Sequence, residues 1–276
     1  MVISGDNMLA KIFITLVKIS PTFQKLIWKW WYQRLGKRAH DSGWTFMNYG
    51  YIPSNKEFIK KLNPEDESNR MFIQLYDYVV SQIQLEGLNV LEVGSGRGGG
   101  ASFIARYYHP KNMTGLDYSV SATKLSNKLH ENISNLDFVN GDAENLPFDD
   151  ETFDVVINVE SSHCYGNMKS FVNEAYRVLK IGGHFSWADL RGKDMIDNTD
   201  TIFKLSKFQS IHESHITSEV IDALDVIHDK KMEMIKNYVP RFLRTAFMDF
   251  AGVKNSQIYN AFKGGNAVYL SKLFKK

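Results

Sequence analysis

The chain has 276 residues, 43% of them hydrophobic and 23% charged, the proportions of an ordinary soluble globular protein with one large domain or two small ones. A formal charge of only +2 gives no global electrostatic case for nucleic-acid binding, which usually shows a strongly basic face. The single cysteine, Cys164, excludes an intrachain disulfide and a cysteine-based metal cluster, so we expect a reducing, cytoplasmic setting.

The segment 1–38 combines lysines, arginines and tryptophans with a single acid, Asp6, and Pro21 divides it into two predicted amphipathic helices. In one interpretation the helices pack on the domain. In the other they lie on an anionic membrane surface, where each basic residue adds about 1 kcal/mol. The apolar stretch 12–17 is too short to span a bilayer. We assign 1–68 to these helices and a lid segment, and 69–276 to the main domain.

A helix is predicted over 69–84, and short apolar strands then alternate with helices. The predicted strands are 89–93, 113–117, 136–141, 153–159 and 184–190, and the predicted helices between them are 101–107, 122–129 and 168–179. This alternation predicts an α/β fold whose mostly parallel sheet is covered on both faces.

The alternation stops at about 195–250, where we expect roughly three helices inserted as a cap over the substrate. The polar cluster His212, Glu213 and His215 falls in this helical stretch, and we interpret it as solvated rather than as a metal site. The tail predicts an antiparallel hairpin, with strands at 256–262 and 267–273 joined by a Gly-Gly turn.

A glycine-rich turn follows the first strand and opens a helix. Glycines there let the backbone turn sharply and approach a ligand without a Cβ in the way. The spacing of Gly94, Gly96 and Gly99 also fits a dinucleotide fingerprint, so the surroundings must decide. Glu92 lies just before the glycines, where its charge suits a sulfonium or ammonium group and repels a pyrophosphate.

Two further acids follow the next two strands. Asp117 comes about 20 residues on, where a carboxylate accepts hydrogen bonds from ribose hydroxyls, and Asp142 can accept one from an adenine amino group. Each acid alone could be a helix cap. Together with the glycine turn at 182–183 they predict a cleft for a nucleoside that carries a cationic methionine group.

These motifs resemble the class I S-adenosylmethionine-dependent methyltransferases, which share a Glu/Asp-x-Gly-x-Gly-x-Gly loop, acids ending strands two and three, and a final antiparallel hairpin. The resemblance implies a Rossmann-like, mostly parallel seven-stranded sheet and S-adenosyl-L-methionine as cofactor. The cofactor contacts that it implies are Glu92, Gly94, Ser95, Gly96, Gly98, Asp117, Tyr118, Asp142, Ala143 and Asn158.

A closer resemblance is to the phthiotriol/phenolphthiotriol dimycocerosates methyltransferase family of mycobacteria, which O-methylates a secondary alcohol on a waxy lipid. The similar segments are 28–32, the glycine loop through Ser102, 136–165, 188–191 and 242–244, so the likeness spans nearly the whole chain. The run Ser162-His163-Cys164-Tyr165 is more specific to this family. The resemblance implies O-methylation of a lipid, polyketide or related natural product.

Methyl transfer from a sulfonium is an in-line displacement, in which orientation supplies roughly 7–11 kcal/mol and a general base typically about 10²–10⁴-fold. His163, after the fourth strand, is the candidate base, although a histidine that only packs beside the cofactor is the alternative. Candidate acceptor contacts are Glu160, Tyr165, Phe203 and Phe242, where core packing is the other explanation of the aromatic residues.

Three alternatives remain at this point. The first is C- or N-methylation of a sterol- or quinone-like acceptor. A nicotinamide dehydrogenase is disfavoured by Glu92 and the predicted hairpin. A non-catalytic cofactor-binding or membrane-associated protein is disfavoured by the complete set of cofactor motifs.

Overall fold

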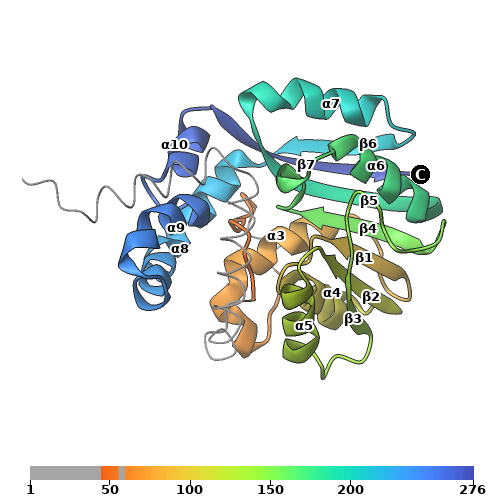
Figure 1. Ribbon diagram of the computed structural model, residues 1–276, viewed down its shortest axis with the longest axis horizontal. Helices are drawn as coiled ribbons and strands as arrows, with labels where there is room; N and C mark the ends of the chain where they lie inside the picture. Colours follow the sequence, from red (N-terminus) through yellow and green to blue (C-terminus); the bar gives the residue numbers. More distant parts are fainter. Residues whose placement is uncertain (1–44, 56–59) are drawn as a thin grey trace, which may run out of the picture.

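The computed structural model describes residues 45–55 and 60–276, so the predictions for 1–38 lie outside the described residues. One sheet has the strand order β3-β2-β1-β4-β5-β7-β6 (Figure 1). Its strands are β1 Asn89–Val93, β2 Asn112–Asp117, β3 Leu136–Asn140, β4 Phe153–Val159, β5 Leu179–Gly192, β6 Gln209–His215 and β7 Ala267–Lys275. Only β7 runs antiparallel to its neighbours β5 and β6 in this sheet. The predicted Rossmann-like α/β fold is confirmed.

Helices alternate with the strands as the sequence predicts. They are α3 Arg70–Val80, α4 Gly99–Tyr108, α5 Val120–Leu129, α6 Met168–Val178, α7 Ile196–Lys204, α8 Thr217–Tyr238, α9 Arg244–Ala251 and α10 Gln257–Lys263. Two begin at polar caps: Ser119 accepts a hydrogen bond from the backbone N–H of Ala122, and Asn167 accepts one from that of Ser170. Such caps satisfy backbone donors that the first turn leaves unpaired.

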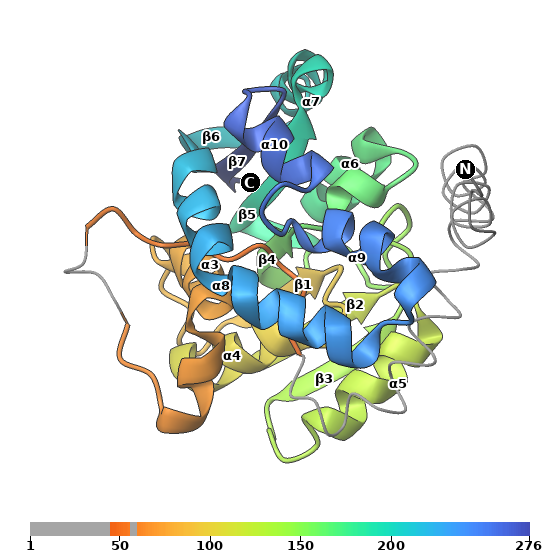
Figure 2. The same ribbon diagram turned by 90° about the vertical axis from the view of Figure 1, so that its left-hand side faces the viewer.

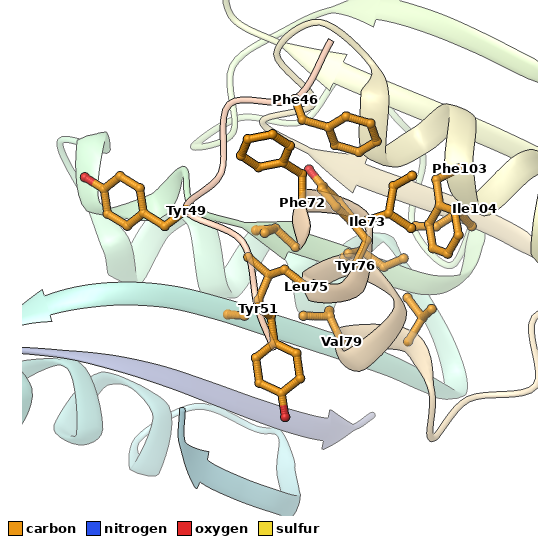
Figure 3. Packing of buried hydrophobic residues seen from close by; sticks show 14 of the residues in the cluster. Phe46, Tyr49, Tyr51, Phe72, Ile73, Leu75, Tyr76, Val79, Phe103 and Ile104 are labelled. Carbon is orange, nitrogen blue, oxygen red and sulfur yellow. The ribbon is translucent and has the colours of Figure 1, made fainter. Parts of the chain in front are cut away.

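The sheet separates two hydrophobic core clusters. Alternate residues of β4 point to opposite faces, so Val155 packs with α3 and α4 whereas Val156 packs with α6 and α7. Figure 3 shows part of the first cluster, in which the rings of Phe46 and Phe72 stack with centroids 6.2 Å apart. Because both faces are covered, the strand ends that carry polar residues are held rigidly.

The strand predicted at 256–262 is wrong. These residues form α10, which begins after Ser256, whose side chain accepts a hydrogen bond from the N–H of Tyr259. Tyr259 and Phe262 are buried three residues apart, which is a helical spacing. A short apolar run does not distinguish strand from helix, and the cap was the signal that decides it.

The helix predicted across 209–215 is also wrong, because these residues form β6 and pair with β7. His212, Glu213 and His215 therefore lie on an edge strand, where Glu213 accepts a hydrogen bond from Lys272. Nearly every residue of β6 is exposed, so the strand lacks the alternation that identifies one in sequence. β7 therefore pairs antiparallel with β5 and β6, and not with residues 256–262.

Helices α8 and α9 lie at the end of the sheet where the parallel strands finish, and the two views agree on this (Figures 1 and 2). They follow β6 and belong to the predicted cap insertion at about 195–250. No helix in the described part of the chain is long and apolar enough to cross a bilayer.

Candidate active site

The glycine loop begins where β1 ends. Gly94 and Gly98 have φ angles of +81° and +77°, in the left-handed region that favours glycine. A Cβ on Gly94 would overlap the Ser161 hydroxyl, and one on Gly98 would overlap the Phe138 ring. The loop thus turns sharply and lies tightly against the residues that follow β4.

Asp117 ends β2 with its carboxylate held against this loop. Its Oδ2 accepts a hydrogen bond from the N–H of Gly96 at 2.9 Å, and its Oδ1 accepts one from the N–H of Ser119 at 2.8 Å. Burial raises the pKa of Asp117, and the two hydrogen bonds oppose that rise. The side chain of the next residue, Tyr118, is exposed.

Asp142 and Ala143 follow β3, which pairs with β2 in parallel. Their backbone therefore lies at the same edge of the sheet as Asp117, which ends β2. Asp142 is exposed, and its Oδ1 accepts a hydrogen bond from the N–H of Glu144 at 2.9 Å. Ala143 is buried. An exposed carboxylate beside a buried alanine is compatible with contact to one edge of a purine ring.

Glu92 is fully buried in β1, where its Oε1 accepts a hydrogen bond from the Tyr76 hydroxyl at 2.6 Å. Burial raises the pKa of Glu92 to about 7, while hydrogen bonds from Tyr76 and from the N–H of Ala101 oppose the rise. Its Oε2 has no hydrogen-bond partner among the described residues. A buried half-satisfied carboxylate is costly unless a cation or donor completes it.

The unpartnered polar atoms test whether these residues fit S-adenosylmethionine. Oε2 of Glu92, Oγ of Ser95 and Oδ1 of Asn158 are all buried without a partner in the described structure. Asn158 donates from its Nδ2 to the Val93 carbonyl at 2.9 Å, so its oxygen is the atom left for a ligand. The residues present fit the cofactor, because Glu92 can hold an ammonium group and the others can bond polar atoms beside the loop.

His163 lies in a short 3-10 helix, η3 Ser162–Cys164, directly after β4, and is paired with Asp189 of β5. Its Nδ1 is 2.7 Å from Oδ1 of Asp189, and its backbone N–H donates to Oδ2 at 2.8 Å. Asp189 is completely buried, whereas 30% of the His163 side chain is exposed. Burial disfavours the charged imidazole, but the Asp189 carboxylate outweighs burial and holds the pKa of His163 well above its usual value.

Three polar side chains, Asn158, Ser161 and Tyr165, bond to one another between the end of β4 and the start of the glycine loop. Nδ2 of Asn158 donates to Oγ of Ser161 at 2.7 Å and to the hydroxyl of Tyr165 at 3.1 Å. The two hydroxyl oxygens are 2.9 Å apart. Since Ser161 touches Gly94, His163 lies two residues from the contact between η3 and the loop.

Glu160 has an unusual backbone conformation for a residue other than glycine, with φ at +46°. Its Oε1 accepts hydrogen bonds from the N–H of Tyr49 at 2.7 Å and from the hydroxyl of Tyr269 at 2.9 Å. Burial raises its pKa to about 7, and burial lowers the pKa of Lys231 in α8 to about 7, each charge opposing the other's shift. Glu160 thus ties the 45–51 segment to the end of β4.

Of the two remaining predicted contacts, Phe203 is not brought to this cluster, and the described structure does not test Phe242. Phe203 is buried in the second core cluster, 4.6 Å from the ring centroid of Phe274 and 5.3 Å from that of Trp187. Phe242 belongs to the 3-10 helix η5, Arg241–Leu243, and its side chain lies outside the described part of the structure.

The sequence reasoning missed the partners of the predicted residues: Tyr49, Tyr76, Ser161, Asp189 and Lys231. Asp189 had a usable signal, because it lies in the 188–191 run at the end of a predicted strand. Ser161 had one too, because it lies between the predicted residues Glu160 and His163, whereas Tyr49, Tyr76 and Lys231 come from a loop and two helices that no local pattern connects to the glycine loop.

Comparisons with known proteins agree with this geometry. The methyltransferase domain family matches residues 91–187. The chain is 38% identical to the phthiotriol/phenolphthiotriol dimycocerosates methyltransferase of Mycobacterium leprae over 93% of this chain and 94% of that protein. It is 37% identical to the fatty-acid O-methyltransferase of Mycolicibacterium smegmatis over 83% and 81%. Geranyl diphosphate C-methyltransferase of Streptomyces coelicolor has the same fold, with a TM-score of 0.62 at 13% identity over 88% and 97% of the two chains.

Proposed function

Because the chain belongs to the family of class I S-adenosylmethionine-dependent methyltransferases that includes the phthiotriol/phenolphthiotriol dimycocerosates methyltransferases, we propose that it methylates a hydroxyl oxygen of an apolar, lipid-like acceptor. The observation that carries the proposal is the His163–Asp189 pair beside the glycine loop, with Nδ1 and Oδ1 2.7 Å apart. S-adenosylmethionine supplies an activated methyl group, and the protein supplies orientation and a base.

The pair is arranged as a general base. With Nδ1–H donating to Asp189, the lone pair of the imidazole lies on Nε2 of the partly exposed His163 side chain. Nε2 would take the hydroxyl proton while the oxygen–methyl bond forms and the sulfur–methyl bond breaks, with S-adenosylhomocysteine as the leaving group. The imidazolium produced is stabilised by the buried carboxylate, which also fixes the ring orientation. The base contributes about 10²–10⁴-fold, and positioning contributes the larger part.

The base favours a hydroxyl over a carboxyl acceptor. A carboxylic acid with a pKa near 4–5 is already ionised at neutral pH and needs no proton removed. An alcohol retains its proton until a base takes it. A histidine held by a buried carboxylate therefore has a function in ether formation that it lacks in ester formation.

A small, mostly apolar hollow between the 46–48 segment, α3, α8 and α9 is our candidate site for the acceptor's apolar part. It is lined by Phe46, Phe72, Lys231, Met234, Ile235 and Phe250, among others. Glu160 borders this region through Tyr49 of the 45–51 segment, and Tyr165 faces the glycine loop. We assign both as acceptor contacts, with Phe242 supplied by the cap. A mostly aromatic and aliphatic lining suits a hydrocarbon chain.

The test compares a long-chain secondary alcohol with a fatty acid of equal length as acceptors, by transfer of labelled methyl. We expect the alcohol to be preferred, and His163→Ala to lower turnover with it at least tenfold while cofactor affinity stays within twofold. His212→Ala on the exposed strand β6 is the matched control. Unchanged turnover in His163→Ala, or transfer to the fatty acid alone, contradicts the proposal.

We also propose that residues 1–38 attach the protein to anionic membrane, where an apolar acceptor would be dissolved. The support is the basic and aromatic composition of that segment. Co-sedimentation with phosphatidylserine vesicles should fall sharply when residues 1–38 are deleted, and equal pelleting of both forms refutes the attachment.

A further inference from the structure

Arg191 is a buried arginine near the end of β5, behind the His163–Asp189 pair. Its side chain is only 2% exposed, and Nη1 lies 2.9 Å from Oδ2 of Asp189. Nη1 also donates to the Leu190 carbonyl at 2.6 Å, and Nε donates to Oγ1 of Thr199 at 3.2 Å. The guanidinium therefore has a fixed position on the side of Asp189 away from the imidazole.

Ser162 joins the arginine and the aspartate in a closed network. Its hydroxyl donates to Oδ2 of Asp189 at 2.6 Å and accepts from Nη2 of Arg191 and from the indole N–H of Trp187, both at 2.8 Å. With His163 on the other side, Oδ1 and Oδ2 are both used by donors. Asp189 cannot turn away from the imidazole without breaking several buried hydrogen bonds, each costly to lose.

The charges of the network decide which form of the imidazole is favoured. When His163 is neutral, Asp189 and Arg191 cancel each other in a buried environment. When His163 is protonated, the three side chains carry a net charge of +1 next to a site that binds a cationic sulfonium. Without Arg191, by contrast, Asp189 and a protonated His163 would form a neutral ion pair.

We propose that Arg191 is a positioning residue that offsets part of the charge with which Asp189 favours the protonated His163 imidazole, so that Nε2 can take the acceptor's proton at a lower pH than it could beside Asp189 alone. The proposal rests on the proposed function of His163 as the base. It adds that a group out of contact with the acceptor sets the pH range in which the base works. The carboxylate alone would orient the imidazole but would hold it protonated up to a higher pH than the carboxylate paired with Arg191 does.

Other ionisable groups lie around His163, Asp189 and Arg191. They are the same in the wild-type protein and in the Arg191 variants. They are Tyr49 of the 45–51 segment, Glu160 at the end of β4, Cys164 in η3, Tyr165 after it, and Tyr269 of β7. Arg191 is the one arginine in contact with Asp189 in the described structure, so its replacement changes the charge at the carboxylate directly.

The test is the pH profile of kcat/KM for the acceptor at saturating cofactor. In Arg191→Gln the fall in rate on the acid side should move upward by about one pH unit, because the variant loses a like charge that disfavours the imidazolium through Asp189. The rate at pH 7 then falls about tenfold and recovers at high pH. Arg191→Lys keeps the charge and should keep the wild-type midpoint, as should Arg177→Gln, which removes a partly exposed arginine from the ion pairs of α6.

Arg191→citrulline covers the case in which Arg191→Gln does not fold, because citrulline loses the charge but keeps the shape of the side chain, Nε–H and one terminal NH2 group, with an oxygen in place of the other terminal nitrogen. A rate lowered equally at every pH, with an unmoved midpoint, overturns the proposal and makes Arg191 purely structural. The proposal is also overturned if the midpoint of the acid-side fall in kcat/KM moves by the same amount in Arg191→Lys and in Arg191→citrulline. If instead His163 is not the base, the result is different, because His163→Ala then still shows the fall in rate on the acid side.

Discussion

The Tyr76 hydroxyl donates to Oε1 of Glu92 at 2.6 Å, and Oε2 of the same buried carboxylate has no partner among the described residues. Tyr76 comes from α3, before the glycine loop in sequence, and Figure 3 shows it in the aromatic cluster with Phe72. A Cβ on Gly100 would overlap its ring, so the loop is packed against it. A residue outside the loop thus fixes the carboxylate that we assign to the cofactor's ammonium group.

Tyr76→Phe should therefore weaken binding of S-adenosylmethionine at pH 7. The hydrogen bond favours the charged form of Glu92, and a bond to a charged group contributes about 1.5–3 kcal/mol. We expect about a tenfold loss of affinity in calorimetric titration by a protein that is still folded at the temperature of the titration. Tyr78→Phe, on the same helix with its hydroxyl near Ser214, is the control. Equal affinity in Tyr76→Phe and wild type would remove Tyr76 from the account.

Cofactor affinity should also depend on pH, because burial raises the pKa of Glu92 to about 7. Below this value the carboxyl group is protonated and has no charge to offer an ammonium group. Affinity should therefore rise between about pH 6 and pH 8 and then level off. Glu92→Gln should bind more weakly and lose most of this dependence, as followed by titration at several pH values. If the cofactor affinity of Glu92→Gln changes with pH as steeply as that of the wild-type protein, the titrating group is not Glu92.

We expect Gly94→Ala to abolish cofactor binding although the protein loses only part of its stability. Its φ of +81° is unfavourable for alanine by about 1–2 kcal/mol, and the added Cβ would overlap Ser161. Gly87→Ala is a matched control, since Gly87 has φ of +76° and nothing within 4 Å of its Cβ position. Both variants should lose stability in denaturant unfolding, but only Gly94→Ala should lose at least tenfold in affinity. If Gly94→Ala and Gly87→Ala bind the cofactor with similar affinity, the overlap with Ser161 has no effect on cofactor binding beyond that of backbone strain.

Asp189→Asn should shift the pH profile in the direction opposite to Arg191→Gln. The Asp189 carboxylate outweighs burial in raising the pKa of His163, so its loss lowers that pKa and the acid-side fall in rate moves to lower pH. Turnover at neutral pH should still drop, because asparagine can select the wrong imidazole tautomer. The pH dependence of kcat/KM measures both effects. A shift to higher pH would contradict the electrostatic role of Asp189.

The sequence predicted the parallel part of the sheet well, and the physical reason is visible in β1 and β4. Both strands are buried on two faces, so each contains consecutive apolar residues, Val90-Leu91 in β1 and Val155-Val156-Ile157 in β4, and the predicted ends agree with the structure. The antiparallel edge was predicted poorly. β6 is exposed and polar, and α10 is a short apolar run, so neither has the periodicity that its structure usually gives.

For the site, the sequence indicated residues at strand ends, because the carboxyl ends of parallel strands meet at one edge. Asp117 lies against the glycine loop as that rule expects. Tyr76 and Lys231 were not predictable, since their place at the site depends on how α3 and α8 pack rather than on any local pattern. The same limitation explains Phe203, which the sequence could not distinguish from a core residue.

The central claim is methylation of an apolar hydroxyl with His163 as base. Its most direct measurement is transfer of labelled methyl from S-adenosylmethionine into a lipid extract by the wild-type protein and by His163→Ala, with the product identified by mass spectrometry. We predict a methyl ether on an apolar alcohol, formed at least tenfold more slowly by His163→Ala. Label found only on carbon, nitrogen or a carboxyl group, or equal rates for the two proteins, would contradict it.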